Sequence, residues 1–310
     1  MNSANTISLL KKYVFNFLPK KIKEPVVLFY RNQRYLRCLN IALRDKSELM
    51  RLISECKSGV LIDVTNQKIM WEKNRQSALP IGSMTKIMTA LVILEEMKTN
   101  PQIGLQTRLM VGERFDDIGQ TIGLKIGQSY TVEQLLAGSI IYSANDCVDL
   151  LVRNFFDGKS ETFVKKMNER SKELGLLNTI FYNPHGLEPF PGTYWKNDNL
   201  SPAQDVAYLT EFLISTYPSI LRYSSALELD FMISESHFAR LKNTNHPLLC
   251  NYAKCDGFKT GYTTTAGYCL SGTSKSEGVR YIAVVMGMSS EMYRNVLVNA
   301  LLELGQSNAI

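Results

Sequence analysis

The pattern of hydrophobic and polar positions gives the chain strand-rich ends around a helical middle. Gly59–Val64 is apolar and β-branched, and Lys68–Trp71 follows after the polar pair Thr65-Asn66. This pattern predicts a two-stranded hairpin. Three further strands and a closing amphipathic helix are predicted near the other end, at residues 257–263, 267–273, 279–286 and 292–304. A turn at 274–278 separates the last two strands.

The middle of the chain has the spacing of helices. After the turn-forming residues Pro80-Ile81-Gly82, a helical pattern runs from Ser83 to about Met97. Thr131-x-x-Gln134 is a capping box that opens a helix to about residue 141. Residues 142–145 interrupt the pattern, and a second helix reaches about residue 155. Ser160 and Ser201 are expected to cap two more helices, which end near residues 175 and 216.

Strand segments that lie far apart in the chain predict a mixed α/β fold, with one sheet assembled from both ends and covered by helices. The composition agrees with a globular protein, since 45% of the 310 residues are hydrophobic and 21% are charged. It excludes a mainly disordered chain, a collagen-like repeat and a disulfide miniprotein. No run of about 18 apolar residues is present, so no transmembrane helix is expected.

Positive charge is concentrated in the first 56 residues, which carry eleven Lys and Arg against four Asp and Glu. The net charge there is +7, while the whole chain is +6, so residues 57–310 have a net charge of −1. We therefore expect a basic N-terminal extension at 1–56, one catalytic domain at 57–310, and no nucleic-acid partner for the main body. The extension is a candidate for peripheral contact with anionic lipid, although charge runs are more often simply solvated.

Histidine and cysteine spacing does not indicate a metal site. Three His and six Cys are present, without C-x-x-C or H-E-x-x-H. No metal and no cofactor are expected. Cys250 and Cys255 are near enough in sequence to pair, whereas Cys147, on the first turn of a helix, is interpreted as a packing residue. No clear signal peptide is visible, because the apolar runs near the start are shorter than the 7–15 residues of such a signal.

Three short patterns bear candidate chemistry: Ser83-Met84-Thr85-Lys86, Ser143-Ala144-Asn145 and Lys259-Thr260-Gly261. A serine hydroxyl needs an adjacent base to become a nucleophile. Ser83 and Lys86 share one helix face, and a lysine serves as base when burial and neighbouring positive charge lower its pKa. Lys259 is a candidate for that second charge, and the backbone N–H groups at the helix start suit an oxyanion.

Together the patterns resemble the active site of penicillin-binding serine peptidases and serine β-lactamases. Flanking stretches narrow the resemblance to low-molecular-mass serine-type D-Ala-D-Ala carboxypeptidases, over roughly residues 57–305. These stretches are residues 81–90, Asn183-Pro184-His185-Gly186-Leu187, Asn243-Thr244-Asn245, residues 256–263, Ala266-Gly267-Tyr268 and residues 282–285.

The resemblance implies an antiparallel sheet between helices, with a helical subdomain that carries Ser143-Ala144-Asn145. It also implies removal of the terminal D-Ala from peptidoglycan stem pentapeptides through an acyl-enzyme on Ser83, without a cofactor, and covalent inhibition by β-lactams. Lys86 would be the general base, and Ser143 and Asn145 would assist proton transfer and orient substrate. Lys259 and Thr260 would hold the substrate carboxylate, Gly261 would allow close approach, and the N–H groups of Ser83 and Tyr262 would form the oxyanion hole. His185 is interpreted as a structural hydrogen-bonding residue.

The family acts at the extracytoplasmic face of the cell envelope, so we expect the same location despite the missing export signal. Many relatives carry a small β-rich C-terminal domain and an anchoring helix, and we expect neither in a chain that ends at Ile310. The alternatives are a serine β-lactamase and a non-catalytic cell-wall-binding homologue. An endopeptidase or transpeptidase also stays open, because the same acyl-enzyme can pass to other acceptors.

Overall fold

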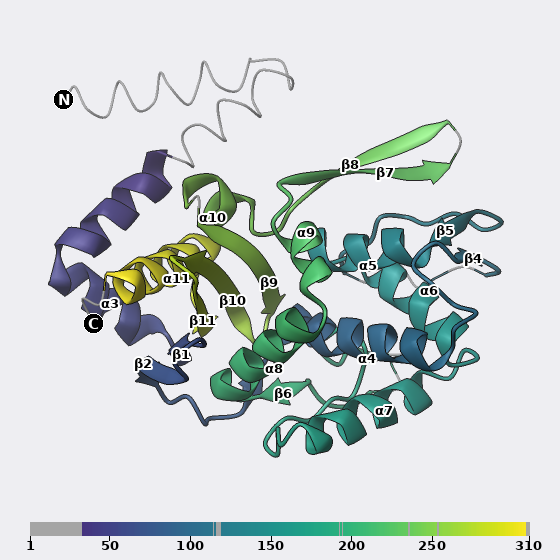
Figure 1. Ribbon diagram of the computed structural model, residues 1–310, viewed down its shortest axis with the longest axis horizontal. Coiled ribbons are helices and arrows are strands. Elements are labelled where there is room, and N and C mark those ends of the chain that lie inside the picture. The colour runs from purple at the N-terminus through teal and green to yellow at the C-terminus, as the bar shows by residue number, and fades with distance from the viewer. Residues whose placement is uncertain are drawn as a thin grey trace.

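The computed structural model describes residues 33–113, 115, 119–191, 193, 195–234, 236–252 and 254–307, and a five-stranded antiparallel sheet lies at its centre (Figure 1). The strand order is β2-β1-β11-β10-β9. Their bounds are β1 Ser58–Asp63, β2 Lys68–Lys73, β9 Cys255–Thr263, β10 Gly267–Ser276 and β11 Val279–Met288. All five strands were predicted from the sequence, and β1 pairs with β11 across more than 200 positions of the chain. The mixed α/β fold with an antiparallel sheet is confirmed.

Both faces of the sheet are covered by helices. Alternate residues of β11 enter different clusters: Ile282 and Val284 join one hydrophobic core, and Ala283 and Val285 join the other. This follows from the two-residue period of a strand. Helices α11 (Glu291–Gln306) and α3 (Lys46–Glu55) pack on one side, and α8 (Ala203–Thr216) covers the other.

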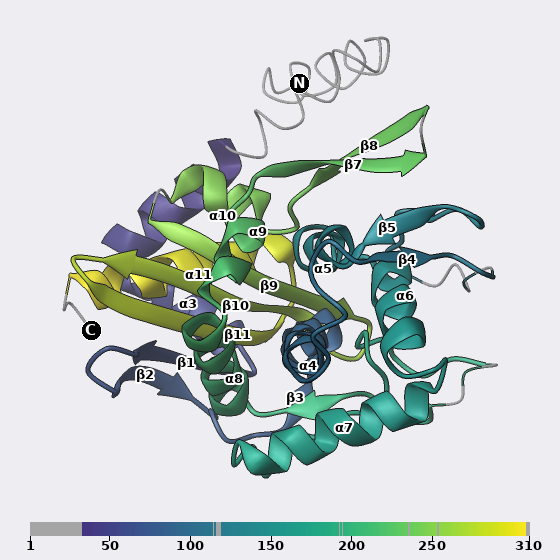
Figure 2. The same ribbon diagram turned by 45° about the vertical axis from the view of Figure 1, so that its right-hand side comes forward.

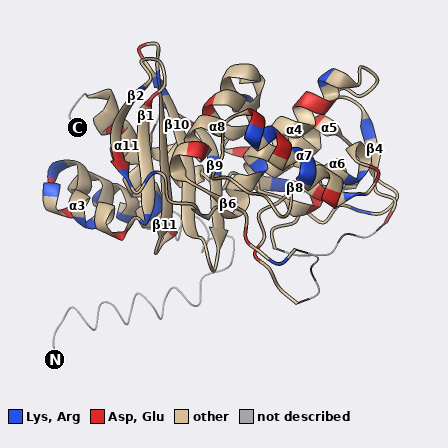
Figure 3. Cartoon of the chain, turned by 90° about the horizontal axis from the view of Figure 1, so that it is seen from below, with Lys and Arg blue, Asp and Glu red and all other residues tan. Residues whose placement is uncertain are grey.

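A helical region lies beside the sheet and contains α4, which is buried on nearly all sides (Figures 1 and 2). Thr131 and Gln134 form the predicted capping box at the start of α5. The helices of this region are α4 Lys86–Thr99, α5 Val132–Ile141, α6 Asn145–Phe155 and α7 Ser160–Glu173. Its surface mixes acidic and basic residues (Figure 3), as in the ion pair between Arg170 of α7 and Glu95 of α4.

Two predicted helix caps are wrong. Ser160 is the first residue of α7 and Lys159 precedes it as the N-cap, without a side-chain capping bond. Ser201 is also not a cap, because Pro202 holds the N-cap position of α8. The Ser201 hydroxyl instead pairs with the Thr179 hydroxyl at 2.8 Å, and Gln204 accepts a hydrogen bond from Arg75. At Ser160 the helix starts one residue earlier than the local signal predicted. At Ser201 a tertiary hydrogen bond takes the hydroxyl that the cap would have used.

The sequence patterns did not predict a long hairpin between the helical region and the sheet. Strands β7 (Glu228–Ser234) and β8 (His237–Lys242) pair and extend away from the body of the molecule (Figure 2). The short elements are β3 Leu79–Pro80, η1 Gly82–Thr85, β4 Arg108–Met110, β5 Ser129–Thr131, β6 Leu200–Ser201, η2 Pro218–Ile220, α9 Leu221–Ser224 and α10 His246–Asn251.

Part of the basic N-terminal segment packs on the sheet domain. Residues 33–44 are helical, and α3 follows. Tyr35, Leu39 and Leu52 are buried in the same core as α11, and Lys73 of β2 donates hydrogen bonds to the carbonyl groups of Ile53 and Ser54. The division at residues 56 and 57 stays a prediction.

None of the helices in the described ranges combines the length and apolar character that a membrane crossing requires.

All six cysteines are free thiols, so Cys250 and Cys255 are not paired in this structure. Cys147 is fully buried, in keeping with a packing role.

Candidate active site

Ser83 lies in the short 3-10 turn η1, which leads directly into α4. The sequence placed Ser83 on the first turn of the helix, whereas the α-helix itself begins at Lys86. The Nζ atom of Lys86 lies 2.9 Å from Ser83 Oγ. The predicted nucleophile and the predicted base are therefore in direct contact.

Lys86 is fully buried, and burial is the main cause that lowers its pKa to about 7. The charge of Asp149 acts in the opposite direction and limits the shift of the pKa. With a pKa in this range, about half of the lysine is neutral at pH 7 and able to accept a proton. Burial therefore accounts for the lowered pKa of Lys86. The second positive charge expected from Lys259 is not among its causes, and the interaction between the two lysines instead lowers the pKa of Lys259.

The second polar contact of Lys86 comes from a loop about 100 residues away. Lys86 Nζ donates to the carbonyl oxygen of His185 at 2.8 Å. A neutral amine that donates this bond through one N–H keeps its single lone pair, which can then face Ser83. Burial lowers the pKa of the His185 ring to about 3, so the ring is neutral, and it packs edge-on against Trp195 with centroids 5.2 Å apart. His185 therefore acts through its backbone, which agrees with its interpretation as a structural residue.

The loop that presents the His185 carbonyl is held by two asparagines. Asn183 Oδ1 accepts bonds from the N–H groups of His185, Gly186 and Leu187 at 3.3, 2.6 and 3.2 Å. Asn199 Nδ2 donates both to the Asn183 carbonyl and to Thr85 Oγ1, at 2.8 and 2.9 Å. This network fixes the loop against η1. Asn183 belongs to a stretch that the resemblance marked, but Asn199 has no sequence signal of its own.

Strand β9 approaches η1 so closely that only glycine fits at the contact. A Cβ atom at Gly261 would lie 2.2 Å from the carbonyl oxygen of Ile81. Gly82 has a φ of +50°, and a Cβ there would lie 2.9 Å from the backbone nitrogen of Tyr262. The backbone of Tyr262 is therefore placed beside the turn that carries Ser83.

Lys259 and Thr260 bring charge and a hydroxyl to the same strand. Lys259 is fully buried, and burial, Lys86 and Arg294 together hold its pKa well below its ordinary value. Thr260 Oγ1 donates to Thr244 Oγ1 at 2.9 Å. Arg294 of α11 was not singled out from the sequence, yet it is buried and its charge helps to lower the pKa of Lys259.

Ser143 and Asn145 lie at the junction of α5 and α6, both buried. Ser143 has a positive φ of 65°, and its hydroxyl forms no hydrogen bond to any described residue. The structure therefore does not place Ser143 in a bond with Lys86. Asp146 anchors the junction, because its carboxylate accepts bonds from the N–H groups of residues 122–124.

The geometry agrees with comparisons to known sequences. Residues 47–290 match the family described as D-alanyl-D-alanine carboxypeptidase, peptidase S11. The chain is 36% identical over 267 residues to the D-alanyl-D-alanine carboxypeptidase DacF of Bacillus subtilis, which covers 86% of this chain and 66% of that protein. It is 32% identical over 248 residues to DacC of Escherichia coli, which covers 77% and 58%. The chain thus spans about 58 to 66% of the length of these relatives.

Solved structures show the same fold. The ampicillin-bound penicillin-binding protein D2 of Listeria monocytogenes has a TM-score of 0.70 and 29% identity, and the match covers 81% of this chain and 97% of that one. Penicillin-binding protein 6B of Escherichia coli has a TM-score of 0.71 and 30% identity, with coverage of 81% and 77%. Given this match and the Ser83–Lys86 contact, the chain belongs to the D-alanyl-D-alanine carboxypeptidase family, peptidase S11.

Proposed function

We propose that this chain is a serine-type D-Ala-D-Ala carboxypeptidase that removes the terminal D-Ala from peptidoglycan stem pentapeptides. The observation that carries the proposal is the contact between Ser83 Oγ and a buried Lys86 whose pKa is lowered to about 7. A nucleophile and a base in direct contact satisfy the first requirement of acyl transfer. Family membership supports the choice of substrate.

In the acylation step, Ser83 Oγ attacks the carbonyl carbon of the penultimate D-Ala while Lys86 Nζ takes the hydroxyl proton. The bond between this carbon and the nitrogen of the terminal D-Ala then breaks, and the leaving amine receives a proton. Ser143 and Asn145 assist this transfer and orient the substrate amide. Water then attacks the Ser83 ester, which releases the shortened peptide and restores the serine.

The substrate is held at both ends of the reacting bond. Lys259 and Thr260 bind the terminal carboxylate, and Arg294 strengthens the positive field at that end. The N–H groups of Ser83 and Tyr262 stabilise the oxyanion. The close approach of β9 to η1 at Gly261 and Gly82 supports this role, because it places the backbone of Tyr262 beside the turn that carries Ser83. We also propose that β-lactams acylate Ser83 and that the chain acts at the extracytoplasmic face of the cell envelope.

Fluorescent penicillin provides the first test. We expect a stable adduct on the intact protein by mass spectrometry and no adduct on Ser83→Ala. Labelling of a folded Ser83→Ala variant would overturn the assignment of the nucleophile. Release of D-Ala from a pentapeptide then tests the substrate, and rapid turnover of nitrocefin would instead favour a β-lactamase.

A further inference from the structure

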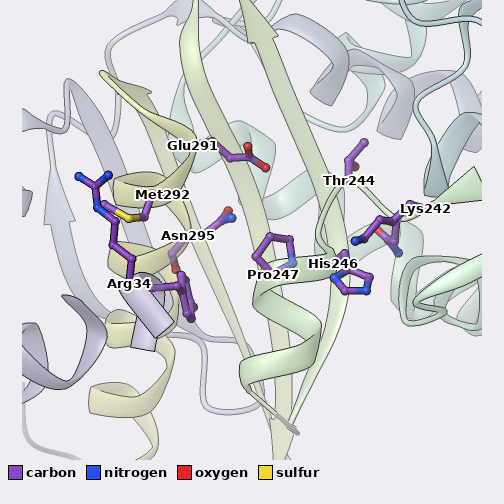
Figure 4. Close-up of a pocket in the computed structure, with 10 residues that line it drawn as sticks. Arg34, Lys242, Thr244, His246, Pro247, Glu291, Met292 and Asn295 are labelled. Carbon is purple, nitrogen blue, oxygen red and sulfur yellow. The ribbon is translucent and has the colours of Figure 1, made fainter. Parts of the chain in front are cut away.

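A cavity of about 420 Å³ is lined in part by Thr244 (Figure 4), which is the hydrogen-bond partner of Thr260 in the candidate site. Its walls come from three separate parts of the chain: the N-terminal helical residues Arg34 and Tyr35, the start of α11, and residues 242–247. The function proposed above does not use this space. Figure 4 shows Glu291, Met292 and Asn295 of α11 on one side, with Pro247 and His246 facing them.

Thr244 connects the cavity to the reaction site. It lines the cavity, and its hydroxyl accepts the hydrogen bond from Thr260. Its backbone N–H donates to the Ile141 carbonyl at 2.9 Å, next to the junction that holds Ser143. Asn243 Oδ1 accepts from the N–H of Asn245 at 2.8 Å, and Asn245 Nδ2 donates to the Phe258 carbonyl at 2.9 Å. The wall is therefore fixed relative to β9.

The direction along β9 determines which part of a substrate meets the cavity. In the proposed function Tyr262 contributes to the oxyanion hole and Thr260 binds the terminal carboxylate. With these roles, the path from Tyr262 to Thr260 follows the substrate toward its leaving residue. Thr244 is the next contact on this path. The cavity consequently lies on the leaving-group side. A leaving D-Ala has only a methyl side chain, which is small compared with a space of this size.

The polar groups of the cavity favour an acidic ligand. Arg34 and Lys242 contribute two cations, and within the described part of the chain neither forms an ion pair. The one carboxylate of the wall, Glu291, lies 3.7 Å from Arg294. Burial and the charge of Lys242 lower the pKa of His246, while Glu228, which lies opposite Lys242 in the β7–β8 hairpin, acts in the other direction. The net shift is downward, so the ring is neutral at neutral pH. Asn295 lines the same space and is buried, and its amide oxygen accepts hydrogen bonds from Arg294 Nε and Nη2 at 3.0 and 2.9 Å (Figure 4).

We propose that this cavity binds the side chain of a leaving D-amino acid that is longer than alanine and carries a carboxylate. This inference rests on the proposed function and extends its substrate class beyond D-Ala. The bond that breaks is the same one: the acyl group passes to Ser83 Oγ, and the amine of the larger D-residue leaves with the proton from Lys86. Peptides that end in a D-residue with an acidic side chain are then substrates.

The test compares peptides that are identical except for the last residue, which is D-Ala, D-Glu, D-Gln or D-Lys. D-Glu and D-Gln have nearly the same shape, so their ratio of kcat/KM isolates the charge. We expect D-Glu to be cleaved about fivefold faster than D-Gln, the size of effect of one partly exposed ion pair. In Lys242→Gln the ratio should fall toward one, whereas Lys165→Gln, on the exposed surface of α7, should keep it.

Several outcomes overturn the inference: no cleavage of D-Glu when D-Ala is released, faster cleavage of D-Lys than of D-Glu, or a ratio that Lys242→Gln leaves unchanged. If the D-Ala peptide is not cleaved either, the proposed function is wrong. The cavity is then tested by ligand binding alone. Binding of free D-Glu and D-Gln is measured by NMR titration. Tighter binding of D-Glu that is lost in Lys242→Gln supports the cavity, and equal binding of both ligands overturns it.

Discussion

The backbone carbonyl of His185 accepts a hydrogen bond from Lys86 at 2.8 Å, although the two residues are 99 positions apart. This bond uses one N–H of the lysine and leaves the side of Nζ that faces Ser83 for the hydroxyl proton. The orientation of the base therefore depends on a loop that carries none of the three short sequence patterns. Asn183 and Asn199 determine the position of that loop.

The pH dependence of acylation should follow the protonation of Lys86. Because the pKa of Lys86 is lowered to about 7, its neutral fraction rises as the pH rises through that value. The second-order rate constant for penicillin acylation should rise with a midpoint near pH 7 and level off about one pH unit higher. Stopped-flow or gel-based labelling between pH 5 and 9 measures this profile.

Asp149→Asn provides a check on the cause of this profile. The charge of Asp149 raises the pKa of Lys86, so its removal should move the midpoint to lower pH. A profile without a midpoint, or a midpoint that moves to higher pH in Asp149→Asn, would contradict the assignment of Lys86 as the base.

Gly261→Ala should damage the site, because the new Cβ would lie 2.2 Å from the carbonyl oxygen of Ile81. Separating β9 from η1 would displace Tyr262 from Ser83. A displacement of about 1 Å near reacting groups lowers rates by about 100-fold, and we expect a loss of acylation of that order. Gly104→Ala is the matched control, since a Cβ atom at that position would meet no other atom within 4 Å. Acylation of Gly261→Ala at the unaltered rate would show that the close approach is not needed.

Asn183→Ala removes the acceptor for three backbone N–H groups of the loop around His185. We expect acylation to slow by about tenfold or more, because the carbonyl that orients Lys86 loses its support. Asn168→Ala is a control of the same residue type, which binds the backbone of Phe181 away from Lys86. It should lower the Tm without slowing acylation per folded molecule. Equal effects of both variants on the rate would mean that Asn183 only stabilises the fold.

Leu52→Ala tests whether the domain begins before residue 57. Leu52 is 1% exposed in the core shared with α11, so its truncation should destabilise the protein by about 2–4 kcal/mol. The Tm should then fall by about 5 °C or more. Met50→Ala, on the same helix but 53% exposed, should have little effect. An unchanged Tm in Leu52→Ala would favour a separable extension that ends at residue 56.

The sequence by itself determined the parts of this protein that depend on local order. The periods of the apolar residues gave the five strands of the sheet and the main helices, because a side chain on a strand or helix repeats its environment at a fixed spacing. Ser83 and Lys86 are three positions apart on one helical segment, so their contact also follows from local geometry. The capping box at Thr131 and Gln134 was predicted for the same reason.

Tertiary structure alone decided the features that join distant segments. The stretch around His185 was marked by the resemblance, but its sequence does not show that the His185 carbonyl binds Lys86. Asn199 and Arg294 have no sequence signal, yet Asn199 holds the His185 loop against Thr85 and Arg294 lowers the pKa of Lys259. The Ser201 hydroxyl pairs with Thr179 and does not cap a helix. The lowered pKa values of both lysines likewise arise from burial by the whole fold. Burial and long-range contact depend on how elements pack together, and a linear pattern of residue types does not encode which surfaces will meet.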